Sequence, residues 1–176
     1  MCSENGFLSD DGVVVKLSED AYLCHTTSGG SDRIHAHMEE WLQTEWWDWN
    51  VYVANLTEQY AQVGVVGPKA RDVLEKLGGL DVSKEALGFM EYAEGRLGAF
   101  DVRAFRISFS GELSYEIAVP AGQGLAFWQA HRSQTTLQPS IQGSLVLQRW
   151  PHRVQKANVF CLKSPECAFC LLCGWQ

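Results

Sequence analysis

The sequence contains no run of eighteen apolar residues, so we expect none of its segments to span a membrane. The opening residues, MCSENGFLSDDG, lack the basic stretch and following apolar stretch of a secretory signal peptide. We therefore expect a cytoplasmic protein, in which cysteines stay reduced. Basic residues are also scarce, with 14 Lys and Arg against 21 Asp and Glu and a formal net charge of −7. This balance argues against nucleic acid as the main partner.

Several chemical signatures are absent as well. No glycine-rich dinucleotide fingerprint occurs, so we expect no nicotinamide or flavin site in this chain. The five His residues do not cluster: His35 and His37 lie two residues apart in a predicted helix and so point to different faces. No His has a Cys or Ser partner at a spacing typical of a nucleophile.

The composition changes near residue 130. Residues 1–130 contain 9 Lys and Arg against 20 Asp and Glu, whereas residues 131–176 contain 5 against a single acid. Four of the six cysteines also lie in the last sixteen residues, where no helix or strand periodicity is sustained. We therefore divide the chain into a domain over 1–130 and an unrelated tail over 131–176. The C-x5-C-x2-C-x2-C spacing in that tail is compatible with zinc or an iron–sulfur cluster. It lacks a second CxxC pair at zinc-finger distance and a Cys-Pro ending, so we predict no metal site.

The hydrophobic pattern predicts an α+β fold, with an antiparallel sheet and helices on one of its faces. Ser31 or Asp32 is the predicted cap of the first helix, whose buried face holds Ile34, Met38, Trp41 and Leu42. Four strands are expected between residues 89 and 120, with turns at Glu94-Gly95, Gly98 and Ser110-Gly111. The other predicted elements are strands 13–17 and 22–26, a helix over 33–45, a hairpin of 51–56 with 60–66, a helix over 68–77 ended by Gly78-Gly79, and a third helix from 121.

Two stretches place carboxylates where chemistry is possible. Asp10 and Asp11 enter a strand from a turn, so one should face solvent and the other a cleft or the core. An Asx turn that starts the strand explains them equally well. In RISFSGELSYEIAVP, alternation puts Tyr115 and its apolar neighbours on one face and Glu116 on the other. Glu116 then either lies on a polar surface or lines a pocket, where it can accept paired hydrogen bonds from a planar amino-heterocycle.

Three motifs, in this order, resemble the aminomethyltransferase (glycine-cleavage T-protein) superfamily. MCSENGFLSDDGVVVKL is similar to its N-E-x-G-G-x-x-D-D-L-x-V-x-R-L stretch, and VGVVGPKARDVLEKL to its A-V-x-G-P-x-[AS]-x-x-v-L segment. RISFSGELSYEI is similar to its R-T-G-Y-T-G-E-x-G-[FY]-E signature. The variants TTSGG and EEWLQTEW are most similar to the folate-binding domain of heterotetrameric sarcosine oxidase α subunits.

The resemblance implies site residues one by one. Asp11 matches an aspartate that lies near N5 and N10 of tetrahydrofolate and assists transfer of the one-carbon unit. Glu116 matches the glutamate that holds the pterin ring. Phe109 stands where T-proteins have a folate-contacting Tyr. Thr27 lies in a segment that replaces the family's Val-Asn-Ala. Arg106 matches the arginine that begins the signature, and both a structural role and a contact with the ligand stay open for it.

The function implied is tetrahydrofolate binding in a sarcosine oxidase α-like protein, where a one-carbon unit from sarcosine oxidation passes to tetrahydrofolate. The other sarcosine oxidase subunits are the implied partners, and FAD, FMN and NAD belong to the rest of that enzyme. A second enzymatic hypothesis is a glycine-cleavage-type aminomethyltransferase. A non-catalytic folate-binding or subunit-docking module and an inactive truncated product also stay open.

The resemblance has limits at both ends. The family domain begins upstream of Met1, and nothing after Ala130 resembles its G-x-E-x-x-x-x-L-R-x-E-x-G segment or its β-barrel. A frameshift explains the loss of resemblance and the change of composition together, and we favour it over a novel tail domain. We therefore expect this chain alone to show little or no turnover.

Overall fold

The computed structural model describes residues 1–109, 111–134 and 159–163. The chain forms two compact units, Met1–Glu58 with Lys156–Gln176 and Gln59–Gln155. Each unit contains a four-stranded sheet, and every described strand pair is antiparallel. Within the described ranges, helices long and apolar enough to cross a membrane are absent.

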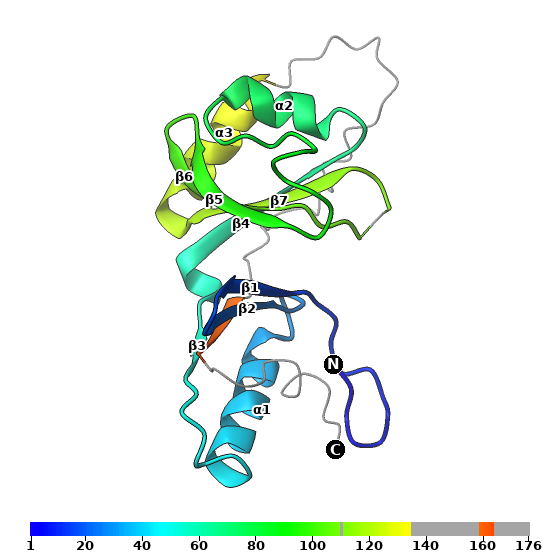
Figure 1. Cartoon of the computed structure of the whole chain (residues 1–176), viewed down its shortest axis with the longest axis vertical. Coiled ribbons are helices and arrows are strands. Elements are labelled where there is room, and N and C mark those ends of the chain that lie inside the picture. The colour runs from blue at the N-terminus through cyan, green and yellow to red at the C-terminus, as the bar shows by residue number, and fades with distance from the viewer. Residues whose placement is uncertain (110, 135–158, 164–176) are drawn as a thin grey trace. The chain divides into compact units, whose positions relative to one another are not determined.

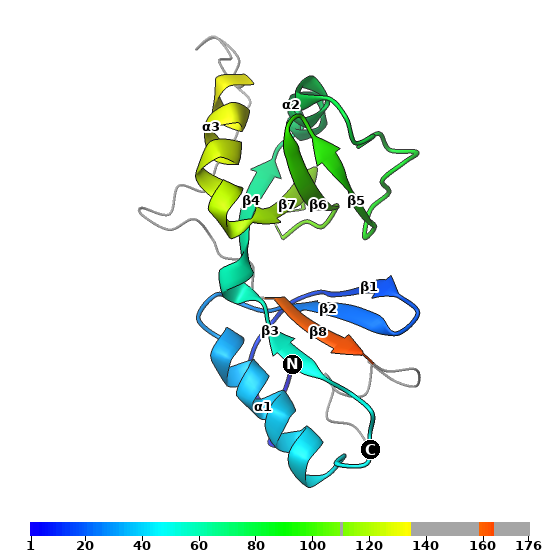
Figure 2. The same ribbon diagram turned by 90° about the vertical axis from the view of Figure 1, so that its left-hand side faces the viewer.

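The unit that contains the N-terminus has the strand order β1-β2-β8-β3. Helix α1, Ser31–Thr44, lies along this sheet (Figure 2) and turns Ile34 and Met38 into a small core with Cys24. The strands are β1 Val14–Ser18, β2 Ala21–His25, β3 Val53–Asn55 and β8 Val159–Lys163. The core therefore forms because one face of α1 is apolar at helical spacing.

The second unit has the strand order β4-β7-β6-β5, with two helices on the same side of the sheet (Figure 1). These helices are α2, Ala70–Leu77, and α3, Gly124–Gln134. The strands are β4 Tyr60–Val66, β5 Tyr92–Leu97, β6 Phe100–Phe105 and β7 Ser114–Pro120. Two 3₁₀ turns, η1 Thr57–Gln59 and η2 Ala121–Gln123, precede β4 and α3.

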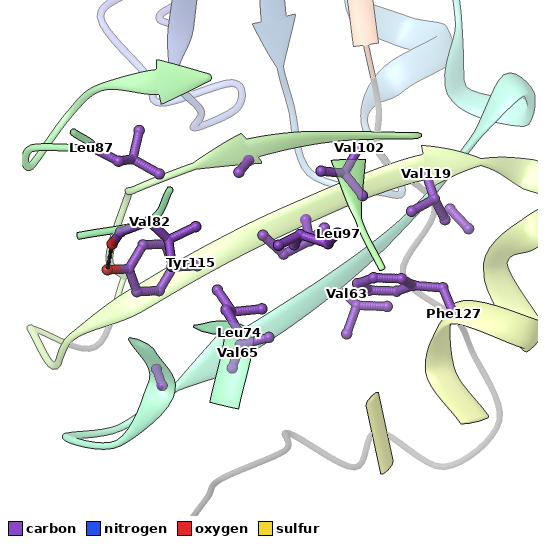
Figure 3. Close-up of a cluster of buried hydrophobic side chains, with 14 residues drawn as sticks. Val63, Val65, Leu74, Val82, Leu87, Leu97, Val102, Tyr115, Val119 and Phe127 are labelled. Carbon is purple, nitrogen blue, oxygen red and sulfur yellow. Dashed lines mark hydrogen bonds between the residues drawn. The ribbon is translucent and has the colours of Figure 1, made fainter. Parts of the chain in front are cut away.

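The core of the second unit lies between its sheet and its helices (Figure 3). Alternate residues of β7 supply its centre, since Tyr115, Ile117 and Val119 are fully buried. The Tyr115 hydroxyl donates to the Val82 carbonyl at 3.1 Å and accepts from the Arg71 Nε at 2.9 Å. The one polar atom of this buried ring is thus hydrogen-bonded, as a buried hydroxyl requires.

The predicted α+β class is confirmed, and so are most element positions. The first helix buries Ile34 and Met38 as its periodicity indicates, whereas Trp41 and Leu42 of the same predicted face are only partly buried. The second helix ends at Leu77, and Gly78 follows in a positive-φ conformation (φ 71°) that favours glycine. Gly98 turns the chain between β5 and β6, also as predicted.

The predicted hairpin of 51–56 with 60–66 is wrong. β3 pairs with β8, and β4 pairs with β7, so the two strands lie in different sheets. The η1 turn separates them. Alternation predicted both strands correctly, but it carries no information about which strand each one pairs with.

Two local predictions also fail. Glu94 and Gly95 lie inside β5, so residues 89–120 form three strands instead of four. A Cβ on Gly95 would come within 2.8 Å of Leu80, so this glycine permits close packing and does not mark a turn. Helix α1 has Gly30 as its N-cap, and glycine has no side chain to form a cap bond; Asp32 lies inside the helix and accepts a hydrogen bond from Asn55.

Candidate ligand-binding site

Strand β7 holds Glu116 on the sheet face opposite the core, and that face is not a solvent-exposed polar surface. Ser114 and Ala118, which flank Glu116 on the same side of the strand, are buried, and Glu116 itself is half-buried. A half-buried carboxylate between buried small residues needs polar partners. The neighbouring strands provide them.

The cross-strand register identifies the neighbours of Glu116. Gly64 of β4 lies on one side of it and Phe105 of β6 on the other. A Cβ on Gly64 would meet no atom within 4 Å, so the sheet surface beside the carboxylate is open. The Gln62 amide donates from Nε2 to Glu116 Oε2. Gln62 Oε1 is buried and accepts no hydrogen bond from the described residues, which leaves an unsatisfied acceptor beside the carboxylate.

Arg103 of β6 completes the polar group on this face. Arg103 is opposite Ala118 of β7, which is two residues further along the strand than Glu116. Its Nε lies 2.8 Å from Glu94 Oε1 on β5, and its Cζ lies 5.0 Å from the centre of the Tyr60 ring on β4. Because β7 runs between β6 and β4, a guanidinium from β6 that covers a ring on β4 lies over β7. Arg103 and Gln62 therefore reach over the strand that bears Glu116 from opposite sides.

Aromatic rings adjoin this polar group. Tyr92 of β5 stacks on the buried Phe105, with ring centroids 5.6 Å apart and planes 20° apart. Burial raises the pKa of Tyr92 to about 12, helped by a hydrogen bond to Glu94 and the charge of Glu94, while Arg103 lowers it. The Tyr92 hydroxyl is thus neutral at ordinary pH and can serve as a hydrogen-bond donor.

The signature residues Arg106 and Phe109 follow β6. Arg106 donates from Nη1 to the Leu87 carbonyl at 3.2 Å, while its backbone pairs with Met90 and Glu91. The buried Arg106 Nε has no hydrogen-bond partner among the described residues. These contacts give Arg106 a structural role in holding the loop that contains residues 87–91. Phe109 is 94% exposed, so its ring faces solvent.

In the N-terminal unit, the two aspartates separate as strand alternation predicts. Asp11 is exposed, and its Oδ1 accepts from the Gly12 amide at 2.8 Å, which is an Asx-type contact. Asp10 is the inward residue, and its side chain has no solvent exposure. Its carboxylate accepts from Thr27 N at 3.0 Å, Thr27 Oγ1 at 3.1 Å, Asp11 N at 2.7 Å and Arg33 Nη2 at 3.4 Å.

Asp10 thus fixes the segment that precedes α1. A Cβ on Gly30 would overlap the Asp10 carboxylate, so the close approach of this loop depends on glycine. The structure brings Thr27 together with Asp10 rather than with Asp11. Strand alternation predicted that one of the two aspartates faces inward without deciding which, and the resemblance singled out Asp11; the glycine pair in TTSGGSDR was the local signal that a carboxylate packs closely there.

The predicted site residues are divided between the units. Asp11 and Thr27 belong to Met1–Glu58, and Arg106, Phe109 and Glu116 belong to Gln59–Gln155. Across the described residues, no group of three or more His, Cys, Asp or Glu side chains is arranged to hold a metal. Cys167, Cys170 and Cys173 of the tail motif lie outside the described residues.

A separate open groove of about 380 Å³ lies in the N-terminal unit, between the N-terminal loop and α1. Trp41 forms part of its wall, and Glu4, Glu40 and Glu45 make it acidic. None of the predicted site residues contributes to it.

The family model of the GCVT N-terminal domain matches residues 1–137. The chain belongs to the GCVT N-terminal domain family. It is 50% identical over 131 residues to sarcosine oxidase subunit alpha of Corynebacterium sp. (strain P-1), covering 73% of this chain and 14% of that protein. The corresponding subunit of Rhizobium meliloti is 42% identical over 126 residues, covering 70% of this chain and 13% of that protein.

Aminomethyltransferases are also relatives of this GCVT-family chain. That of Exiguobacterium sibiricum is 30% identical over 130 residues, which cover 74% of this chain and 34% of that enzyme. The predicted membership of the family is confirmed. The chain spans 14% or less of the sarcosine oxidase subunits named above and about a third of the aminomethyltransferase.

Proposed function

We propose that this chain contributes the tetrahydrofolate-binding part of a sarcosine oxidase α-like protein, which passes a one-carbon unit from sarcosine oxidation to tetrahydrofolate. The identity to sarcosine oxidase alpha subunits supports the choice of parent enzyme. The observation that carries the proposal is the pair of acceptors beside each other on one sheet face, the Glu116 carboxylate and the unsatisfied Gln62 Oε1.

These acceptors complement the donor edge of a pterin. The 2-amino group and the N3–H of tetrahydrofolate are adjacent donors in one plane, and a carboxylate can accept from both at once. Gln62 Oε1 can accept the second proton of the 2-amino group, which removes the cost of a buried unpaired acceptor. Gly64 leaves room for a flat ring beside the carboxylate.

In this proposal the exposed Asp11 handles protons during transfer. A nitrogen of tetrahydrofolate attacks the methylene carbon of the iminium derived from sarcosine, and the bond from that carbon to the glycine nitrogen breaks as the second nitrogen attacks. The protons of N5 and N10 end on the leaving glycine nitrogen. The preceding oxidation, with FAD, FMN and NAD, belongs to other parts and subunits of the proposed parent enzyme.

Tetrahydrofolate titration of the full chain tests the proposal. We expect Glu116→Gln to weaken binding by about 10- to 100-fold, because an amide replaces one acceptor with a donor facing the ligand donors. Glu112→Gln is the matched control, since it changes the same charge at an exposed turn position four residues away. Isothermal titration calorimetry under anaerobic conditions gives the dissociation constants. Absence of binding by the unmodified chain, or equal binding by both variants, would contradict the proposal.

A second candidate is a non-catalytic folate-binding or subunit-docking module. Its support is the exposed aromatic surface after α1, where Trp47 and Tyr52 are 77% and 71% exposed. A one-carbon transfer assay on the intact parent protein separates the two candidates, since this chain alone is expected to show little or no turnover. Formation of 5,10-methylenetetrahydrofolate from a sarcosine-derived donor supports the enzymatic function, whereas tetrahydrofolate binding without transfer supports the module.

A further inference from the structure

We propose that Arg103 is a specificity-determining residue of the Glu116 site, which recognises the 4-oxo group of the pterin and rejects 4-amino analogues. The inference rests on the proposed function and extends it to a residue outside the three motifs. It follows from the position of Arg103 in the sheet, from the contacts that orient its guanidinium, and from the order of donors and acceptors on this face.

The position of Arg103 follows from the register. Phe105 is opposite Glu116 and Arg103 is opposite Ala118, so the arginine lies diagonally across from the glutamate on the same face. Diagonal residues in antiparallel strands are about 7–8 Å apart, within reach of long side chains. Ala118 adds no bulk between them. A planar ligand held by Glu116 would therefore have the guanidinium at its edge.

The orientation of Arg103 is fixed from two sides. Glu94 binds its Nε at 2.8 Å, and the Tyr60 ring lies under its Cζ at 5.0 Å. The Arg103 side chain is 24% exposed, so this ion pair is partly shielded from water. Nε is engaged by Glu94, which leaves the two Nη groups as donors toward a ligand.

The order of polar groups above β7 matches one heterocycle edge. Gln62 Oε1 is an acceptor from the β4 side, the Glu116 carboxylate is an acceptor in the middle, and Arg103 is a donor from the β6 side. A 2-amino-4-oxopyrimidine presents an amino group, then N3–H, then a carbonyl oxygen in that sequence. A 4-amino analogue lacks the N3–H and turns a donor toward Arg103, so the site would lose one bond and gain a donor–donor contact.

The test compares two ligands that differ at the 4-position, tetrahydrofolate and 4-amino-4-deoxytetrahydrofolate, titrated into the full chain. We expect wild type to prefer tetrahydrofolate by about 100-fold or more, and Arg103→Met to reduce this ratio by about 10-fold or more. Arg96→Met is the matched control, because Arg96 lies on the adjacent strand and pairs with exposed Asp101 at 3.5 Å. It should leave the ratio unchanged.

Each outcome decides something. An unchanged ratio in Arg103→Met, with tetrahydrofolate still bound, would overturn the role of Arg103 and leave the proposed function standing. Absence of tetrahydrofolate binding by wild type would overturn both. Should Arg103→Met unfold, Arg103→Lys keeps the charge and the aliphatic stem but loses the planar fork, and its ratio should also fall. An unchanged ratio in Arg103→Lys would then count against the proposal.

Discussion

Asp10→Ala is expected to destabilise the N-terminal unit by about 1–3 kcal/mol, because it removes a buried carboxylate that accepts hydrogen bonds from Asp11, Thr27 and Arg33. Thr27 would lose partners for both its amide and its hydroxyl, and Arg33 would lose its carboxylate. The Asp10 side chain is completely buried, whereas its donors belong to exposed residues that water can satisfy in part. The cost therefore arises from unsatisfied donors more than from the ion pair, since the Arg33 side chain is 57% exposed.

Asp11→Ala is the matched control for this prediction. It removes the same side chain at the adjacent position, where the carboxylate is exposed and contacts the neighbouring Gly12 amide. A change within about 0.5 kcal/mol is expected there. Urea unfolding followed by tryptophan fluorescence is the measurement, since four of the seven tryptophans lie between residues 41 and 49 of this unit. Equal losses in the two variants would show that Asp10 does not anchor the loop.

Comparing Asp10→Ala with Asp11→Ala also tests the role proposed for Asp11 in one-carbon transfer. In the proposed reaction Asp11 acts on protons, whereas Asp10 holds Thr27 and the segment around it. Asp11→Ala should therefore leave the fold intact, so that any loss in one-carbon transfer by the intact parent protein can be assigned to chemistry. Adjacent aspartates with different burial thus separate a structural role from a proposed catalytic one.

The sequence predicted those parts of the fold that depend on local periodicity. Alternation along residues 114–120 correctly assigned Tyr115 and its apolar partners to the core, and helical spacing correctly assigned Ile34 and Met38. Pairing is different, because it depends on residues far apart in the chain. β4 finds its partner in β7, about fifty residues later, and no local pattern in either strand encodes that choice.

The sequence likewise predicted only part of the candidate site. The family resemblance supplied Glu116, and the alternation of β7 supplied its face. Gln62 and Arg103 were missed, because they join Glu116 through the register of three strands. Alternation also could not tell whether the face of Glu116 is solvated or covered, since that depends on the neighbouring strands. The one local signal for Gln62 was its position as a polar residue in a strand, two positions before Gly64.

Phe127→Ala is expected to destabilise the second unit by about 3–5 kcal/mol, the range for removing a large aromatic side chain from a core. Phe127 is the fully buried anchor of α3 and meets Phe100 edge-on, with centroids 5.4 Å apart and planes at 84°. Its ring lies among the side chains that join α3 to the sheet (Figure 3). Truncation would leave a cavity at the point where α3 is attached.

Leu125→Ala controls for helix propensity and apolar character, because Leu125 lies on the same helix and is 66% exposed. It should change stability by no more than about 0.5 kcal/mol. Hydrogen exchange of β4 and β7 amides measures both variants, since these strands open with the unit's core. Phe127 packs on the face of β7 that bears Tyr115, and Glu116 lies on the other face. Phe127→Ala should therefore lower the folded fraction while the molecules that remain folded bind tetrahydrofolate with unchanged affinity. A loss below about 1 kcal/mol would mean that α3 does not stabilise the sheet that presents Glu116.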